Sequence, residues 1–141
     1  MNTLTEITFN INISPSEINT VNFKKHLCTK YNNNIHNGIY INEILKIIKL
    51  NYGKILSNGY INVNIEATCD IIDLKIEHVY ANIIITNYNK LGSFVNLNKV
   101  SIFIPKEFSI DEQTLETGSS IDLKIVGKRI DDKIMCIGQQ V

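Results

Sequence analysis

The stretch that decides the fold is "NGIYINEILKIIKLNYGKIL", residues 37–56, whose apolar residues fit two periods at once. The i, i+3, i+4, i+7 spacing of one helix face is met by Ile41, Ile44, Leu45 and Ile48. The two-residue period of a strand, broken only at Glu43, is met by Ile39, Ile41, Leu45 and Ile47. Five of the ten residues from Ile39 to Ile48 are isoleucine, and β-branching favours strands. Because turn signals stand at Asn37-Gly38 and Asn58-Gly59, we predict sheet for Ile39–Ile48.

The flanking segments indicate further strands and one helix. "ITFNINISP" (residues 7–15) alternates apolar and polar residues, which predicts a strand that stops at Pro15. Ser14 followed by Pro15 is typical of a helix start, so we predict a helix from there to the Asn run at residues 32–34. "YINVNIEATCDII" (residues 60–72) predicts a long strand with one dry and one polar face, which forms a hairpin across Asn58-Gly59.

The second half keeps the period of two. Its predicted strands are "EHVYANIIITNY" (77–88), "GSFVNL" (92–97), "VSIFI" (100–104) and the two halves of "IDLKIVGKRIDDKIMCIG" (121–138), with the polar connector "DEQTLETG" (111–118) before the last two. Five short strands in about 65 residues, with a connector after the third, is the layout of an OB-fold barrel. We therefore predict an α+β protein: an antiparallel sheet with one helix in residues 1–70, packed on a five-stranded OB-fold barrel in residues 71–141.

Composition narrows the class of protein. Lys plus Arg and Asp plus Glu both number 14, so the net charge is zero, whereas a dedicated nucleic-acid coat carries a positive excess. Any RNA contact should therefore be local and weak. Asn and Ile make up about a third of the residues, a bias that reports an AT-rich genome rather than a chemistry. No signal peptide or apolar stretch of about 18 residues occurs, so we expect an intracellular protein without a membrane segment.

No pattern predicts a catalytic or metal site. The three cysteines are far apart and form no CxxC pair: Cys28, Cys69 and Cys136. His26 and Cys28 would point apart on a helix, and Asp131-Asp132, even with Asp122, is typical of a turn rather than of a carboxylate cluster. No Ser/His/Asp or Cys/His constellation or phosphate loop has the required spacing. We predict no enzyme activity, no cofactor and no metal.

Two parts of the chain resemble known families. "YNKLGSFVNL…VSIFIPKE" resembles the OB-fold repeated in the largest protein of the bacterial small ribosomal subunit, with Gly92-Ser93-Phe94-Val95 matching its Gly–small–Phe–Val run. The N-terminal half and "LKIVGKRIDDKIMCIG" (123–138) resemble the seventh-subunit family of eukaryotic RNA polymerase II and its archaeal counterpart. The residues that carry this likeness are Pro15, Lys24-Lys25-His26-Leu27, Gly38, Gly53-Lys54-Ile55, Gly59, Asn62-Val63 and Ala67.

The chain also departs from that family. The first barrel strand, within "DLKIEHVY" (73–80), lacks the usual Pro and Gly, and Ala81 stands near the place of a second Gly. The chain is shorter than most cellular members, chiefly in loops. With the Asn/Ile bias, this trimming suggests a divergent copy carried by a large DNA virus.

The resemblance implies a non-catalytic stalk subunit of a DNA-dependent RNA polymerase, with a truncated RNP-like N-terminal domain. Such subunits dock on the core polymerase subunits, pair with a helical partner of the fourth-subunit type, and contact nascent single-stranded RNA. The implied location is the nucleus for a cellular protein, or the virion and host cytoplasm for a viral one. The alternative is a free-standing OB-fold module that binds single-stranded RNA or associates with translation.

The resemblance also implies two sets of site residues. Contact with core polymerase is expected at Gly53, Lys54, Ile55, Asn58 and Gly59. RNA contact is expected at Tyr88, Lys90, Phe94, Phe103, Lys106, Lys128 and Arg129. Two alternatives stay open at this point. Phe94 and Phe103 either stack on bases or fill the barrel, and Lys128-Arg129 is either a phosphate clamp or a solvated pair.

Overall fold

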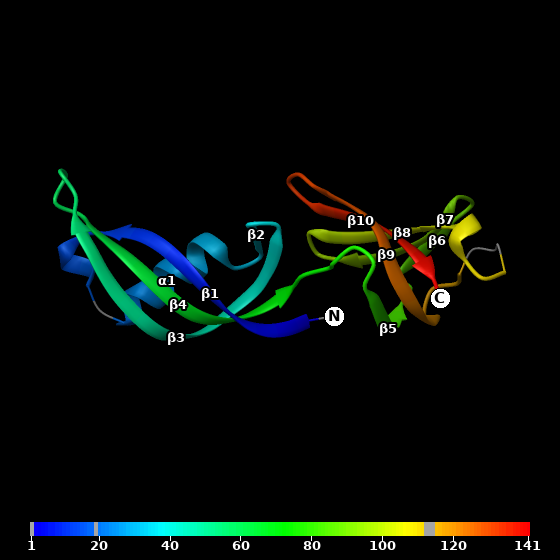
Figure 1. The fold of residues 1–141 in the computed structure, drawn as a ribbon, viewed down its shortest axis with the longest axis horizontal. Helices are drawn as coiled ribbons and strands as arrows, with labels where there is room; N and C mark the ends of the chain where they lie inside the picture. Colours follow the sequence, from blue (N-terminus) through cyan, green and yellow to red (C-terminus); the bar gives the residue numbers. More distant parts are fainter. Residues whose placement is uncertain (1, 19, 112–114) are drawn as a thin grey trace. The chain divides into compact units, whose positions relative to one another are not determined.

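The structure, a computed structural model, describes residues 2–18, 20–111 and 115–141. Its elements in chain order are β1 (Asn2–Ile13), η1 (Pro15–Glu17), α1 (Thr20–Tyr31), β2 (Asn34–His36), β3 (Ile39–Ile55), β4 (Ile61–Ile72), β5 (Val79–Ile84), β6 (Asn87–Asn89), β7 (Gly92–Leu97), β8 (Val100–Pro105), η2 (Lys106–Phe108), β9 (Ser120–Ile130) and β10 (Ile134–Gln140) (Figure 1). They form two compact units: an N-terminal unit of residues 2–36 and 41–71, and a second unit of residues 37–40 and 72–141. The fold is α+β, as predicted.

The stretch that had two readings is a strand. β3 runs from Ile39 to Ile55 and lies between β4 and β2 in a sheet of order β1-β4-β3-β2. Strand propensity and the two flanking turns therefore prevail over the helical spacing. The helical spacing still has a structural cause, because Ile41 and Ile44 are both buried although they are three residues apart. Burial in this part of β3 therefore departs from strict alternation, since Tyr40 beside Ile41 is buried as well.

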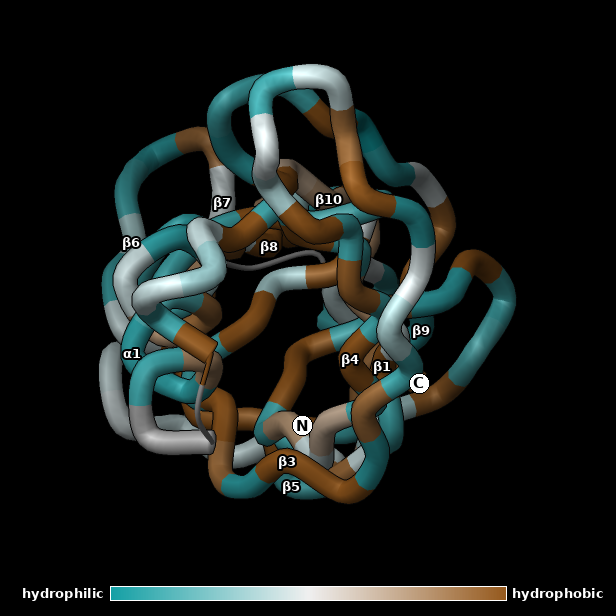
Figure 2. The backbone as a smooth tube through the Cα atoms, turned by 90° about the vertical axis from the view of Figure 1, so that its left-hand side faces the viewer, coloured by the Kyte–Doolittle hydropathy of each residue, from teal (hydrophilic) through white to brown (hydrophobic). Residues whose placement is uncertain are grey.

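One face of the N-terminal sheet is covered by α1, as the ribbon shows (Figure 1). The helix buries Phe23, Leu27 and Tyr31, and the ring of Tyr31 lies 4.5 Å from that of Phe9 on β1. From β4 the alternate residues Val63, Ile65, Ala67, Cys69 and Ile71 face the helix. Hydropathy accordingly alternates in bands along the strands (Figure 2). The predicted dry and polar faces of this strand are confirmed.

The opposite face of this sheet is a polar network of asparagine side chains. Asn10 on β1 donates to Asn62 and Asn64 on β4, and Asn62 donates back to Asn10 and to Asn12, at 2.7–2.8 Å. Gly53 makes room for this network, because a Cβ there would lie 3.0 Å from the backbone oxygen and 3.2 Å from the side-chain oxygen of Asn62. Exposed amides thus pair with one another across strands.

The predicted helix start at Pro15 is wrong. Ser14 caps only the single 3-10 turn η1, its hydroxyl accepting from Ser16 N–H at 3.4 Å. Ile18 is then extended, with φ −77° and ψ 92°, so the backbone leaves the helical region and α1 begins only at Thr20. The predicted end is confirmed: α1 stops at Tyr31, and Asn33 has a positive φ of 59°, a conformation that Asn tolerates.

The second unit is a six-stranded curled sheet of order β5-β9-β10-β8-β7-β6. Its two outermost strands, β5 and β6, are consecutive in sequence and are separated only by Ile85 and Thr86. Ile85 N–H donates to Ser119 O at 2.9 Å, while Thr86 N–H donates to Phe94 O at 2.9 Å. One bent strand therefore pairs with β9 through its first half and with β7 through its second. Counted as one strand, it makes five, and with β10 parallel to β8 the sheet is OB-like, as predicted.

Two details of the second unit differ from the prediction. Residues 75–78 form a turn rather than the start of a strand: His78 N–H donates to Lys75 O at 3.2 Å, Glu77 has a positive φ of 69°, and β5 begins at Val79. The polar connector was predicted over residues 111–118, but its residues 112–114 lie outside the described part of the chain. Before it, the structure has the short η2, Lys106–Phe108.

A glycine substitution tests the packing of this unit. A Cβ on Gly92 would collide with Ile104 O and approach the Phe103 ring and Pro105 Cα to 2.9 Å. Backbone cannot yield as a flexible side chain does, so Gly92→Ala should destabilise the fold by about 2–3 kcal/mol. Gly127→Ala is the matched control, because its Cβ would meet nothing closer than 3.8 Å. Chemical denaturation of both variants measures the effect, and equal stabilities would contradict this account.

The N-terminal unit should lose stability in mild acid through His36. Its ring packs 5.2 Å from Phe9 and 5.0 Å from Tyr31, and burial, aided by the charge of Lys30, lowers the pKa of His36 below 6.5. Below pH 6.5 the unfolded chain binds a proton that the folded chain resists, so stability falls until the lower, folded pKa is passed. The unfolding free energy of the parent and of His36→Phe is measured at pH 7.5 and at pH 5. The difference between the two pH values should be smaller for the variant. An unchanged pH dependence would refute the assignment.

Candidate functional site

The outer surface of the OB-like sheet carries a pair of stacked aromatic rings. Phe94 on β7 is registered directly opposite Phe103 on β8, and the ring centroids are 4.9 Å apart with an interplanar angle of 27°. Their strand neighbours Val95, Ile102 and Ile104 are the buried ones. Because side chains alternate between the two faces of a strand, the two rings lie outside the core and are partly exposed.

The aromatic pair continues into apolar residues of the next two strands. Ile137 on β10 is registered with Phe103 on one side and with Gly127 on the other, and Met135 is registered with Arg129. A shallow hollow of 380 Å³ lies among these residues. We call Phe94, Phe103, Gly127, Arg129, Met135 and Ile137 the aromatic face. Met135 and Ile137 were not predicted as site residues, since only the parallel pairing of β10 with β8 brings their strand beside Phe103.

Not all of the predicted RNA-contact residues lie on this face. Tyr88 is registered with Ser93, which is buried, so the two side chains point to the sheet side opposite Phe94. Lys90 and Lys106 are exposed near one end of the sheet, where Lys106 N–H donates to Leu91 O at 3.1 Å. The aromatic pair and the two lysines therefore occupy different places on the second unit.

Lys128 and Arg129 are adjacent in sequence but differ in environment. The Lys128 ammonium donates to Leu74 O at 3.0 Å and to Gly38 O at 3.4 Å, lies 4.0 Å from an Asp73 carboxylate oxygen, and its side chain is only 16% exposed. Arg129 is 78% exposed and pairs with Asp131 at 2.8 Å. The sequence left open a phosphate clamp or a solvated pair. Lys128 is neither solvated nor directed outward, since its ammonium contacts two backbone carbonyls and Asp73.

The five residues predicted to contact core polymerase are gathered at one end of the N-terminal unit. Gly53, Lys54 and Ile55 end β3, while Asn58 and Gly59 lie in the turn to β4. The turn is closed by Leu56 N–H donating to Tyr60 O at 2.7 Å and Gly59 N–H donating to Leu56 O at 2.9 Å, and Gly59 has the positive φ of 84° that glycine allows. All five residues are exposed, Ile55 by 76%.

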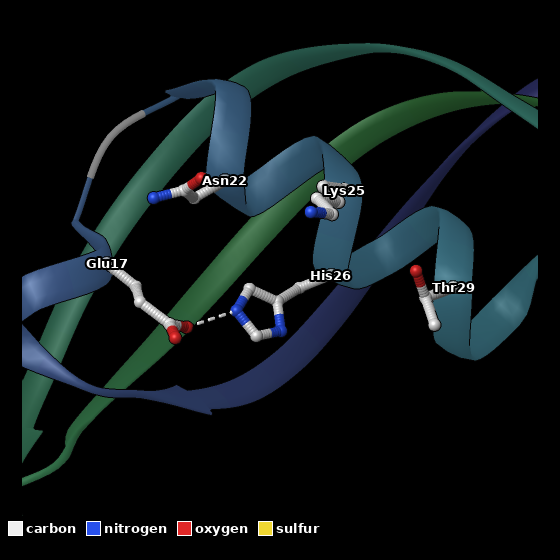
Figure 3. Close-up of a pocket in the computed structure, with 5 residues that line it drawn as sticks. All are labelled: Glu17, Asn22, Lys25, His26 and Thr29. Carbon is white, nitrogen blue, oxygen red and sulfur yellow. Dashed lines mark hydrogen bonds and ion pairs between the residues drawn. The ribbon is translucent and has the colours of Figure 1, made fainter.

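A third surface, absent from the sequence predictions, lies between η1 and α1. Glu17 and His26 are joined by a hydrogen bond of 2.5 Å beside Asn22, Lys25 and Thr29 (Figure 3). Both partners are about half exposed. An exposed carboxylate–imidazole contact with no third catalytic group at hand among the described residues ties the 3-10 turn to the helix. The sequence did not predict this contact, because the distance between Glu17 and His26 depends on the extended backbone at Ile18, which separates η1 from α1.

The described residues offer little reactive chemistry. Burial raises the pKa of Cys69 to about 11, assisted by the neighbouring Cys28, and burial also raises the pKa of Cys136. Those two thiols are therefore poor nucleophiles. Within the described ranges no group of three or more His, Cys, Asp and Glu side chains could hold a metal ion. The same part of the chain has no helix with the length and apolar character needed to cross a membrane.

Comparison with known proteins finds a partial similarity to an RNA polymerase subunit. No family model matches the chain. Over 64 residues it is 33% identical to "DNA-directed RNA polymerase II subunit rpb7" of Schizosaccharomyces pombe, an alignment that covers 34% of this chain and 37% of that protein. The match thus spans little more than a third of the relative's length. It agrees with the resemblance to the stalk-subunit family over that part of the chain.

The contrast between Lys128 and Arg129 can be measured. Lys128→Ala removes the donor from two backbone carbonyls, so we expect a loss of about 1–3 kcal/mol in the free energy of unfolding. Arg129→Ala removes an exposed ion pair and should change it by less than about 0.5 kcal/mol. Urea denaturation of the two variants provides the comparison. Equal losses would show that Lys128 has no structural role.

Proposed function

We propose that this protein is a non-catalytic stalk subunit of a DNA-dependent RNA polymerase. The observation that carries the proposal is the coincidence of two likenesses in one chain: the 33% identity to an RNA polymerase II subunit and the OB-like second unit. Each alone is weaker, because OB-like sheets serve many functions. In this role the protein acts by binding and not by chemistry, which suits its exposed and unreactive candidate surfaces.

The proposal assigns the β3–β4 hairpin end to core polymerase. Gly53, Lys54, Ile55, Asn58 and Gly59 form an exposed end with one basic and one large apolar side chain. Such an end suits insertion between other subunits, because a buried apolar anchor contributes most of the binding energy of a contact. A helical partner of the fourth-subunit type would complete the stalk. Its location would be that of the polymerase: the nucleus of a cell, or the virion and host cytoplasm if the viral origin suggested by composition holds.

The decisive experiment is affinity purification from cells that make the protein naturally. Tagged protein should recover the large polymerase subunits, and Lys54→Glu/Ile55→Asp should reduce that recovery at least tenfold, because the anchor becomes charged. Lys75→Glu/Ile76→Asp is the matched control, since it changes another exposed Lys-Ile pair, in the second unit, and should recover the subunits normally. Recovery of the parent protein without polymerase subunits would refute the proposal.

The aromatic face supports a second candidate function. A free-standing module for single-stranded RNA, or one associated with translation, would also present stacked rings on an OB-like sheet. The zero net charge favours weak RNA binding and hence the stalk, in which RNA contact is auxiliary.

RNA titrations distinguish the two candidates. For the stalk we expect binding of a uridine oligonucleotide weaker than micromolar, and a further loss of about fivefold or more in Phe103→Ala, because base stacking contributes about 1–3 kcal/mol. Phe108→Ala, an exposed phenylalanine outside the aromatic face, should bind like the parent. Sub-micromolar, strongly salt-dependent affinity of the isolated protein would favour the free-standing module instead.

A further inference from the structure

We propose that the free edge of β3, residues 45–55, takes up an extended acidic segment of another protein as an added strand. This inference does not depend on the proposed polymerase role, because it follows from the backbone and charges of the strand itself. It concerns the long edge of the sheet, which shares only residues 53–55 with the hairpin end, and its test variants lie outside those three residues.

The first observation is the unpaired backbone. β3 has 17 residues, but its neighbour on the side away from β4 is the three-residue β2. The segment after α1 reaches only to Ile44: Asn33 N–H donates to Ile41 O at 2.8 Å, and Ile44 N–H donates to Asn32 Oδ1 at 2.9 Å. The first six residues of β3, up to Ile44, are therefore covered on that side. The other 11 of its 17 residues, 45–55, have no neighbouring strand there among the described residues, and β3 lies along the outside of its sheet (Figure 1).

The second observation is that this edge is unusually long and contains no proline. Natural sheets keep edge strands short or interrupt them, because an open row of N–H and C=O groups pairs with other chains. Strands typically have about 5–6 residues, so an open edge of about twice that length could hold a complete partner strand. It also presents apolar side chains, since Leu45, Ile48, Tyr52 and Ile55 are all more than a third exposed.

The third observation identifies the occupant by charge. From residue 45 to residue 55 the exposed charges are Lys46, Lys49 and Lys54, and the segment has no Asp or Glu. Cross-strand pairs of opposite charge stabilise a sheet, whereas like charges facing each other destabilise it. A second copy of this chain would bring lysines against lysines. A segment that alternates acidic and apolar residues fits both the charges and the apolar side chains.

The other edge strand of the sheet lacks this signature. β1 carries the single acidic residue Glu6, and its Asn10 and Asn12 side chains are engaged by the amide network with β4. Charge complementarity therefore selects β3 and not β1 as the receiving edge.

The test uses a synthetic ten-residue peptide that alternates Glu with Val and Thr, added to the full chain. Hydrogen exchange should slow at amides between residues 45 and 55 that exchange quickly in the free protein. Lys46→Glu/Lys49→Glu should weaken binding at least tenfold and gain binding to the corresponding Lys/Val/Thr peptide, which also shows that the variant is folded. Lys24→Glu/Lys25→Glu, the same charge change at exposed positions of α1, should alter affinity less than twofold.

Several outcomes would overturn the proposal. In the first, all amides from residue 45 to residue 55 already exchange slowly in the free protein. In the second, the acidic peptide slows exchange in another part of the chain. In the third, the parent protein binds the acidic and the basic peptide equally well. A stable dimer at micromolar concentration whose formation protects residues 45–55 would assign the edge to a second copy and refute the acidic partner.

Discussion

The second unit depends on one strand that serves two partners. At Ile85 and Thr86 the backbone changes from hydrogen bonds with residues 118–119 to a hydrogen bond with Phe94, so residues 79–89 pair with β9 and then with β7. The sheet must curl for its two ends to share this strand. Curling gives the sheet an inside, which collects residues such as Ile83 and Val95, and an outside, where Phe94 and Phe103 remain partly exposed. The aromatic face is thus a consequence of how the sheet closes.

The sheet of the N-terminal unit does not curl on itself, and a single helix covers one of its faces (Figure 1). One helix can bury only one face of a four-stranded sheet, so the other face must be stable in water. Asparagine side chains that pair between β1 and β4 meet this need. Asparagine also occupies left-handed positions at Asn33, Asn37 and Asn98. The asparagine bias, whatever its genomic origin, therefore has structural uses in this fold.

Both units present exposed apolar and basic surfaces, and their described residues assemble no group of His, Cys, Asp and Glu side chains that could hold a metal ion. The hairpin end, the β3 edge and the aromatic face consist of exposed apolar and basic groups, whereas the two buried thiols are protonated and Lys128 is held by backbone carbonyls. These are the surfaces that the proposed binding role would use. The partial likeness to a polymerase subunit agrees with that physical reading.

By itself the sequence determined the local structure wherever side-chain alternation and turn chemistry agree. The isoleucine content between the Asn37-Gly38 and Asn58-Gly59 turns specified β3, the alternation of apolar residues specified β4, and the five-strand spacing specified an OB-like sheet. Tertiary structure alone decided the rest. The helix start moved to Thr20 because Ile18 is extended, Met135 and Ile137 joined Phe103 through parallel pairing, and Lys128 turned inward to carbonyls distant in sequence. These are contacts between distant segments, and a periodicity within one segment contains no information about which other segment it will meet.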